Sequence, residues 1–251
     1  MEDADKESLV EERQMDASII VPCYNEEKRL PTDVFSDFMK KHREIAFLFV
    51  NDGSSDKTGE VLRKLCLEHP NAEYFELAQN SGKAEAVRQG MLQALVSKAP
   101  FIGFWDADLA TPLEELPRML AGARDSTLYV SGCRLLRLGT RIRRNPFRHY
   151  IGRVFATAAS LYLDLPVYDT QCGAKIYAAD VVSAVFRKPF VSEWCFDVEI
   201  LRRMTRLYGR ERIIADGLEF PLSCWEDKSG SKIRLWRVMK DLFRLLSLKD
   251  E

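Results

Sequence analysis

Runs of consecutive apolar residues separated by stretches with helical spacing constrain the fold of this chain more than any other feature. The apolar runs are "ASIIVPC" at 17–23, "IAFLFVN" at 45–51, "AEYFEL" at 72–77 and "FIGFW" at 101–105. The helical stretches between them lie at about 32–41, 55–68 and 83–98. Continuous apolar runs are typical of parallel strands that are covered on both faces. The alternation predicts an α/β protein with an open, mostly parallel sheet flanked by helices.

Three of the predicted strands end in polar clusters, "PCYNEE", "NDGSSD" and "DADLATP". Because ligands of such sheets bind beyond the carboxyl ends of the strands, we expect the three clusters to meet along one edge. Asp106 and Asp108, one residue apart, suit a hard divalent cation, Mg²⁺ or Mn²⁺, that also contacts substrate phosphates. An isolated D-x-D is also common in solvated loops and helix caps.

Composition excludes several classes of protein. A length of 251 residues with 46% apolar residues fits one large domain, and a net charge of −1 argues against whole-molecule affinity for nucleic acid. Six cysteines without a CxxC pair, and only three histidines, support neither a zinc site nor a disulfide framework. Neither GxGxxG after the first strand nor GxxxxGK[ST] occurs, which argues against the two common glycine-rich phosphate sites.

The chain divides into three predicted parts. Residues 1–16 are an acidic flexible arm, 17–227 form the α/β domain, and 228–251 form a basic amphipathic helix. That last helix either belongs to the domain or contacts a membrane surface, since an amphipathic stripe looks the same in both cases. The N-terminal stretch has no apolar core of a signal peptide, and no run of 18 uncharged apolar residues occurs. The sequence therefore predicts a cytoplasmic protein with at most a peripheral hold on the membrane's cytoplasmic face.

Residues 134–163 contain seven arginines and no acidic residue, in a chain whose charges otherwise balance. Because the planar guanidinium group suits phosphate, this stretch predicts an anion site, although a solvated basic loop has the same composition. Lys175 and Lys232 are further candidates for contact with the anion. The arginines are Arg134, Arg137, Arg141, Arg143, Arg144, Arg148 and Arg153.

Seven motifs together carry a resemblance to a known family. They are "IIVPCYNEE", "FVNDGSSDKT", "NSGKAEAVRQGM", "WDADLATP", "YDTQCGAKIY", "WCFDVEIL" and "CWEDKSGSKI". In this order and spacing they resemble family-2 glycosyltransferases with the GT-A fold, and most of all the polyprenyl-phosphate branch. The resemblance implies a metal-dependent enzyme that moves a hexose, with glucose favoured, from a UDP-sugar to a polyprenyl or dolichyl phosphate, with inversion at C1.

The resemblance also implies roles for individual residues. Asp106 and Asp108 would hold the metal at the diphosphate, and Asp52 would accept hydrogen bonds from the base or ribose. Arg134 and Arg153 would bind the acceptor phosphate, and Lys83 would lie near the donor. The nucleotide pocket would be lined by Pro22, Tyr24 and Glu26.

Three alternatives stay open at this point. A sugar hydroxyl of a glycan could be the acceptor, and it would need a general base such as Asp197, Glu199 or Asp169, whereas a phosphate monoester brings its own anionic nucleophile. A GDP-mannose-dependent polyprenyl-phosphate mannosyltransferase is disfavoured by Ala110, because that branch often has Gln at this position. A nucleotide-sugar-binding module without turnover is the non-enzymatic alternative, and the presence of both Asp106 and Asp108 argues against it.

Overall fold

A computed structural model describes residues 15–144 and 146–228, without the side chains of 146–148. The predicted N-terminal arm, apart from its last two residues, and the predicted C-terminal helix, apart from its first, lie outside this range. Those two predictions therefore stay predictions.

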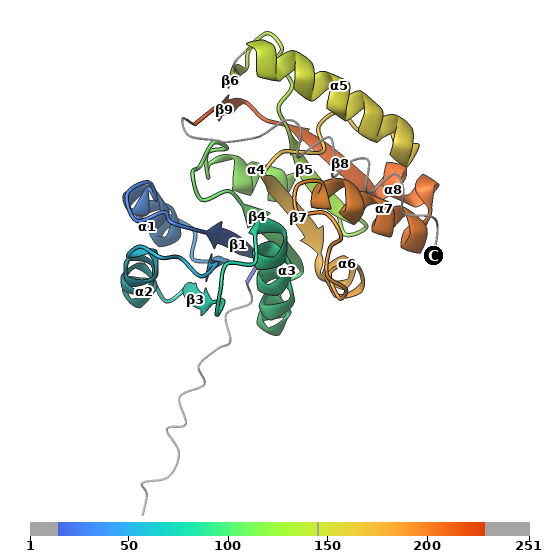
Figure 1. Ribbon diagram of the computed structural model, residues 1–251. Helices are drawn as coiled ribbons and strands as arrows, with labels where there is room; N and C mark the ends of the chain where they lie inside the picture. The colour runs from blue at the N-terminus through green and yellow to red at the C-terminus, as the bar shows by residue number, and fades with distance from the viewer. Residues whose placement is uncertain (1–14, 145, 229–251) are drawn as a thin grey trace, which may run out of the picture.

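A seven-stranded sheet forms the centre of the molecule, with the strand order β3-β2-β1-β4-β7-β5-β8 (Figure 1). Only β7 runs against its neighbours, since β4–β7 and β5–β7 pair in antiparallel fashion and the other pairs are parallel. The prediction of an open, mostly parallel sheet is confirmed. The strands are β1 Ala17–Cys23, β2 Ile45–Asn51, β3 Ala72–Glu76, β4 Phe101–Trp105, β5 Tyr129–Cys133, β7 Ala174–Ala178 and β8 Gly217–Pro221.

Helices cover both faces of the sheet and bury two separate cores, as the alternation along each strand requires. In β1, Ile20 packs into the core with α3, α6 and α7, whereas Ile19 and Val21 pack into the other with α1, α2 and α4. The helices are α1 Thr32–Lys41, α2 Thr58–Glu68, α3 Lys83–Ala94, α4 Glu115–Ala121, α5 Pro146–Leu163, α6 Ala179–Val185, α7 Phe196–Tyr208 and α8 Arg210–Asp216, with a 3₁₀ turn, η1, at Leu95–Ser97.

The register of the parallel strands brings the three polar clusters to one edge. Cys23 at the end of β1 pairs with Asn51 at the end of β2, and Ile20 of β1 pairs with Phe104 of β4. Pro22 lies beyond the last registered pair between β1 and β4, where a strand tolerates the missing N–H. The predicted convergence of the strand ends is confirmed.

Local details differ in two places from the sequence-based expectation. Helix α2 begins at Thr58 and not at residue 55 or 56, and the side chain of Asp56 accepts the Thr58 N–H at 3.0 Å. A second sheet, of β6 Arg141–Arg143 and β9 Cys224–Glu226, pairs two short segments that no sequence pattern announced. All six cysteines are free thiols. Within residues 15–228, none of the helices is both long and apolar enough to cross a membrane.

Candidate functional site

Asp106 and Asp108 lie on a tight turn that directly follows β4. The Leu109 N–H donates to the carbonyl of Asp106 at 3.1 Å, and the Ala110 N–H donates to Oδ1 of Asp108 at 3.0 Å. Leu109 has a φ of 50°, in the left-handed region that a leucine seldom adopts, and such strain is frequent at functional sites. The turn therefore fixes both carboxylates of the predicted metal pair at the sheet edge.

Gly173, just before β7, sets the position of Asp106. Its carbonyl accepts the Asp106 N–H at 2.9 Å, and a Cβ added to it would lie 1.8 Å from Oδ2 of Asp106. Any side chain at this position would push the carboxylate aside. Sequence reasoning did not assign this glycine a role, because its only signal was its place in the motif "CGAK".

The two carboxylates differ in how far the protein compensates their charge. Lys83, the first residue of α3, contacts Oδ1 of Asp106 through Nζ at 2.5 Å. Burial, and then the charge of Asp106, raise the pKa of Asp108 above its ordinary value. The charge of Asp108 is thus incompletely compensated by the protein, whereas Asp106 is paired with Lys83.

The donor atoms at this turn fit a hard divalent ion. Asp106 and Asp108 offer carboxylate oxygens, the ligands that Mg²⁺ and Mn²⁺ prefer. Among residues 15–144 and 146–228, no group of three His, Cys, Asp or Glu side chains is arranged to hold a metal. Water and substrate phosphate oxygens are the ligands that Mg²⁺ usually keeps beside one or two carboxylates.

Asp52, predicted to contact the base or ribose, is buried and braces the segment that precedes Lys83. Its Oδ1 accepts the Ser81 N–H at 2.7 Å and its Oδ2 accepts the Gly82 N–H at 2.9 Å. Asn80 Nδ2 adds a third hydrogen bond, at 3.3 Å to Oδ2. The carboxylate thus joins the end of β2 to the start of α3, and its contact with a nucleotide stays a prediction.

The residues predicted to line the nucleotide pocket lie at and just beyond the end of β1. Tyr24 is exposed, and the Glu26 N–H donates to the hydroxyl of Thr58 at 2.8 Å. Oε1 of Glu26 pairs with Arg29 at 2.8 Å, whereas its Oε2 is buried without a hydrogen-bond partner in the described part of the chain. Burial raises the pKa of Glu26 against the opposing effect of Arg29.

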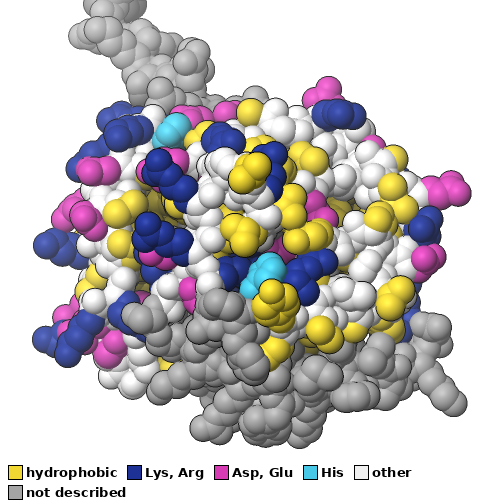
Figure 2. Space-filling view, turned by 90° about the horizontal axis from the view of Figure 1, so that it is seen from above, with side chains coloured by type: hydrophobic (Ala, Val, Ile, Leu, Met, Phe, Trp, Pro, Cys, Tyr) yellow, Lys and Arg dark blue, Asp and Glu magenta, His cyan; other side chains and the backbone are white. Residues whose placement is uncertain are grey.

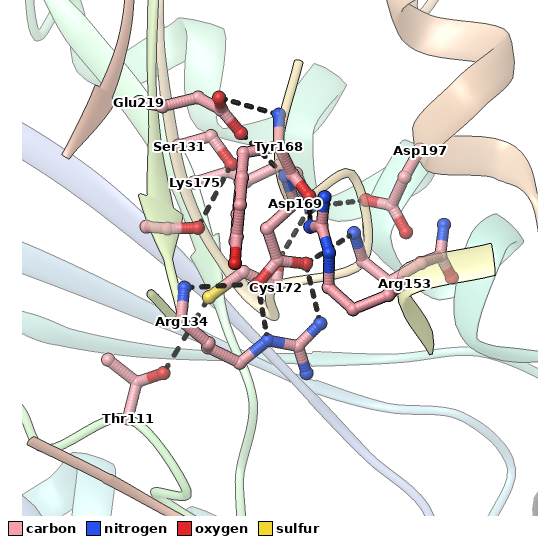
Figure 3. Close-up of polar contacts among 12 residues, drawn as sticks. Thr111, Ser131, Arg134, Arg153, Tyr168, Asp169, Cys172, Lys175, Asp197 and Glu219 are labelled. Atoms are coloured by element: carbon pink, nitrogen blue, oxygen red, sulfur yellow. Dashed lines mark hydrogen bonds and ion pairs between the residues drawn. The ribbon is translucent and has the colours of Figure 1, made fainter. Parts of the chain in front are cut away.

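Arg134, one residue past β5, is held by a buried carboxylate (Figure 3). Its Nε lies 2.6 Å from Oδ2 of Asp169 and its Nη2 lies 2.7 Å from Oδ1, and the Arg134 N–H donates to the same carboxylate at 3.1 Å. Burial alone would raise the pKa of Asp169, but Arg134 outweighs it and holds that pKa well below the usual range. Asp169 is consequently a weak candidate for the general base, and its evident task is to orient Arg134.

Arg153, on α5, contacts Tyr168, the residue that precedes Asp169. Its Nη1 donates to the carbonyl of Tyr168 at 2.7 Å, and its guanidinium group lies 3.6 Å from the centre of the Tyr168 ring. The two arginines predicted to bind the acceptor phosphate are therefore both anchored on Tyr168 and Asp169. Sequence reasoning missed Tyr168, whose only signal was its place in the motif "YDTQCG".

The remaining arginines separate into two groups. Arg144 is half-buried and lies over the ring of Trp225, at 5.3 Å from its centre, and Arg134 lies at 5.2 Å from the same ring. Arg137, Arg141 and Arg143 are exposed, as the basic-loop interpretation expects. The side chain of Arg148 and the whole of Lys232 lie outside the described residues.

Asp197, the predicted general base, is buried at the start of α7 and paired with Lys175 at 2.7 Å. Burial raises the pKa of Asp197, with Lys175 acting in the opposite direction. Glu199 faces elsewhere, since its carboxylate accepts the N–H groups of Val191 and Ser192 and pairs with Arg203 at 2.7 Å. Each carboxylate is therefore already paired with a basic side chain, which makes both residues weak candidates for a general base.

Comparison with known proteins agrees with this arrangement. Residues 18–186 match the family described as "Glycosyl transferase family 2". A dolichyl-phosphate beta-glucosyltransferase, ALG5A, of Trichomonas vaginalis is 30% identical over 89% of this chain and 69% of its own. The human dolichyl-phosphate beta-glucosyltransferase is 30% identical over 86% of this chain and 69% of its own. The resemblance inferred from the seven motifs is confirmed.

A solved structure shares the fold. The glucosyl-3-phosphoglycerate synthase of Mycobacterium tuberculosis, crystallised with Mn²⁺ and UDP-glucose, has a TM-score of 0.65 over 94% of this chain and 81% of its own. The same enzyme was also crystallised with Mg²⁺ and UDP. The structure with UDP-glucose is 15% identical to this chain in sequence, so the similarity shows a shared fold. The predicted GT-A architecture is confirmed.

Proposed function

The chain belongs to glycosyl transferase family 2, and from this premise we propose that it transfers glucose from UDP-glucose to a dolichyl or related polyprenyl phosphate. Relatives that are 28% to 30% identical to this chain carry the name dolichyl-phosphate beta-glucosyltransferase, and they support the sugar and the acceptor. The neighbouring structures with UDP and Mn²⁺ or Mg²⁺ support the nucleotide and the use of a divalent ion.

One observation carries the proposal: the segment 168–173 contacts both the two anchored arginines and the carboxylate turn that is the candidate metal site. Asp169 and Tyr168, at its start, fix Arg134 and Arg153, and Gly173, at its end, abuts Asp106. A nucleotide-sugar diphosphate with its cation would lie at the carboxylates, and an acceptor phosphate would lie at the guanidinium groups. A glycan hydroxyl gives the arginines no comparable partner.

The proposed reaction needs little proton chemistry. An oxygen of the acceptor phosphate attacks C1 of glucose, the bond between C1 and the UDP oxygen breaks, and UDP leaves with the bonding electrons. Because the attacking oxygen is already anionic, the step requires no general base. Arg134 and Arg153 would orient the acceptor phosphate, and Lys83 would face the charge that develops on the leaving diphosphate. A divalent ion bound at Asp106 and Asp108 supplies further electrostatic stabilisation of that charge.

The test is transfer of labelled sugar from UDP-glucose, and in parallel from GDP-mannose, to a short polyprenyl phosphate in detergent with Mn²⁺ or Mg²⁺. We expect glucose to enter the organic-extractable fraction and mannose to remain in the aqueous phase. Transfer of mannose would instead assign the donor of the mannosyltransferase branch. Hydrolysis of UDP-glucose without a lipid product would contradict the acceptor.

We further propose that helix α5 brings the site to the cytoplasmic face of an anionic membrane. Tyr150, Val154 and Leu161 of α5 are 72%, 72% and 78% exposed, and Leu136 and Leu138 of the preceding loop, within the arginine-rich stretch, are also exposed. From residue 134 to 163 there is no Asp or Glu. Figure 2, seen from the side on which α5 lies, shows hydrophobic and basic side chains interspersed near the middle of this face, with acidic side chains mostly toward its edges. That combination is typical of interfacial helices.

A matched pair of substitutions tests the membrane contact. Val154→Asp should reduce co-sedimentation with phosphatidylcholine vesicles that contain about one fifth phosphatidylserine by about tenfold. Leu67→Asp is the control, because Leu67 is 89% exposed but lies on α2, at the other end of the sheet. Equal vesicle binding by the two variants and the unaltered protein would contradict a contact through α5.

A further inference from the structure

The segment that anchors the two arginines is itself held by a third charged residue, Glu219 of β8 (Figure 3). Oε2 of Glu219 accepts the N–H of Tyr168 at 2.7 Å, and Oε1 accepts the N–H of Asp169 at 2.7 Å. One carboxylate thus binds two consecutive backbone N–H groups, each through a different oxygen. Such charge-assisted bonds are about twice as strong as neutral ones.

Three elements far apart in the sequence therefore meet at the Tyr168–Asp169 dipeptide. Strand β5 brings Arg134, helix α5 brings Arg153, and β8, which pairs with β5 at Ser131 and Glu219, brings the clamp. Because each arginine contacts the dipeptide directly, its guanidinium position depends on where the dipeptide lies. The dipeptide position depends in turn on Glu219.

We propose that Glu219 is a positioning residue for the acceptor phosphate: it holds the Tyr168–Asp169 dipeptide, which presents Arg134 and Arg153. Glu219 does not touch the substrate in this arrangement and acts only through the two arginines. This inference rests on the proposed function, since it requires an acceptor with a phosphate.

The distribution of unused donor groups agrees with this role. Asp169 occupies Nε and Nη2 of Arg134, and among the residues that the structure describes nothing hydrogen-bonds to its Nη1. The Tyr168 carbonyl occupies only Nη1 of Arg153, whose guanidinium face lies on the Tyr168 ring. Each guanidinium group is thus fixed on one side and keeps N–H donors for a ligand.

Two pairs of variants separate positioning from general stability. Glu219→Gln keeps the size of the side chain but places an amide N–H₂ against one backbone N–H. Its matched control is Glu199→Gln, because Glu199 likewise accepts two consecutive backbone N–H groups, those of Val191 and Ser192, through a carboxylate that no arginine of the acceptor site contacts. Tyr168→Leu removes the ring under Arg153, and Tyr168→Phe retains it.

The measurement is the KM for a short polyprenyl phosphate and the KM for UDP-glucose, with the melting temperature of each variant. We expect Glu219→Gln and Tyr168→Leu to raise the acceptor KM by about tenfold and leave the donor KM within about twofold. Glu199→Gln should lower the melting temperature without that split, and Tyr168→Phe should keep the acceptor KM of the unaltered protein.

Two results would overturn the inference while the proposed function stands. One is a Glu219→Gln variant that transfers glucose with both KM values unchanged or equally changed. The other is a Glu219→Asp variant, whose shorter side chain cannot hold both N–H groups in the same position, with an acceptor KM equal to that of the unaltered protein; this result decides the question even if Glu219→Gln fails to fold. Absence of any transfer to a polyprenyl phosphate by the unaltered protein would instead refute the proposed function itself.

Discussion

The carboxylate turn after β4 and the arginine cluster around Tyr168 and Asp169 differ in how far the protein compensates the charge of their carboxylates. At the turn, Asp108 has a single backbone hydrogen bond and a raised pKa, so its negative charge is poorly compensated. At the cluster, Asp169 pairs with Arg134 through two oxygens and has a lowered pKa. In the proposed function a divalent cation would supply the missing positive charge at the turn, whereas the cluster is organised before any ligand arrives.

The largest effect should come from removing a ligand at the carboxylate turn. Asp108→Ala should lower metal-dependent glucose transfer by about 1,000-fold, because the leaving diphosphate loses its cation, while the fold persists. Transfer rates at saturating Mn²⁺ and the melting temperature provide the measurement. Asp37→Ala is the control, since Asp37 is an exposed residue of α1. An unchanged rate in Asp108→Ala would contradict a catalytic metal bound at this turn.

A smaller loss should follow when the turn is disturbed from outside. Gly173→Ala places a methyl group where the Asp106 carboxylate lies, so that the carboxylate must move. We expect the affinity for UDP in the presence of Mn²⁺ to fall by about 100-fold in titration calorimetry. An affinity equal to that of the unaltered protein would show that the position of Asp106 is not what Gly173 protects.

Disrupting the arginine cluster should cost stability as well as acceptor binding. Asp169→Asn leaves the buried Arg134 without its charge partner, and we expect a loss of about 3 kcal/mol in the free energy of unfolding. Glu226→Gln breaks an exposed pair with Arg143 and should cost less than about 0.5 kcal/mol. Equal losses in urea denaturation would mean that Asp169 is no more important to the fold than a surface ion pair.

The unaltered protein and the Asp169→Asn variant should also differ in how their stability depends on pH. Because the pKa of Asp169 is lower in the folded state than in the unfolded state, its contribution is complete above the unfolded value, about 3.9, and is lost as the pH falls toward the folded value. The stability gap between the unaltered protein and Asp169→Asn should therefore shrink below about pH 4. A gap that widens in acid would contradict the lowered pKa.

The two regions also differed in how far the sequence predicted them. The carboxylate turn was predictable because Asp106 and Asp108 follow an apolar run directly, and neighbouring parallel strands must deliver their ends to one edge. Arg134 and Arg153 were predicted as acceptor-phosphate residues from composition and resemblance. Their partners were not, because Asp169 lies 35 residues from Arg134 and Glu219 lies 50 residues from Asp169.

The order of the strands explains that failure. Strand β7 enters the sheet antiparallel between β4 and β5, and β8 pairs with β5, a topology that periodicity cannot reveal. Gly173 and Glu219 acquire their roles only through that topology. Asp52 shows a related limit, because its motif indicated a nucleotide contact while its carboxylate is engaged by the backbone of Ser81 and Gly82.

The most direct test of a phosphate acceptor compares two lipids that differ only in that group. Glucose transfer from UDP-glucose should be measured with a polyprenyl phosphate and with the polyprenol of the same length, in the same detergent and metal. We expect product from the phosphate alone, because Arg134 and Arg153 have no ligand on the alcohol, and the candidate bases Asp169 and Asp197 are already paired with Arg134 and Lys175. Comparable transfer to the alcohol would contradict the assignment of the arginine cluster to the acceptor phosphate.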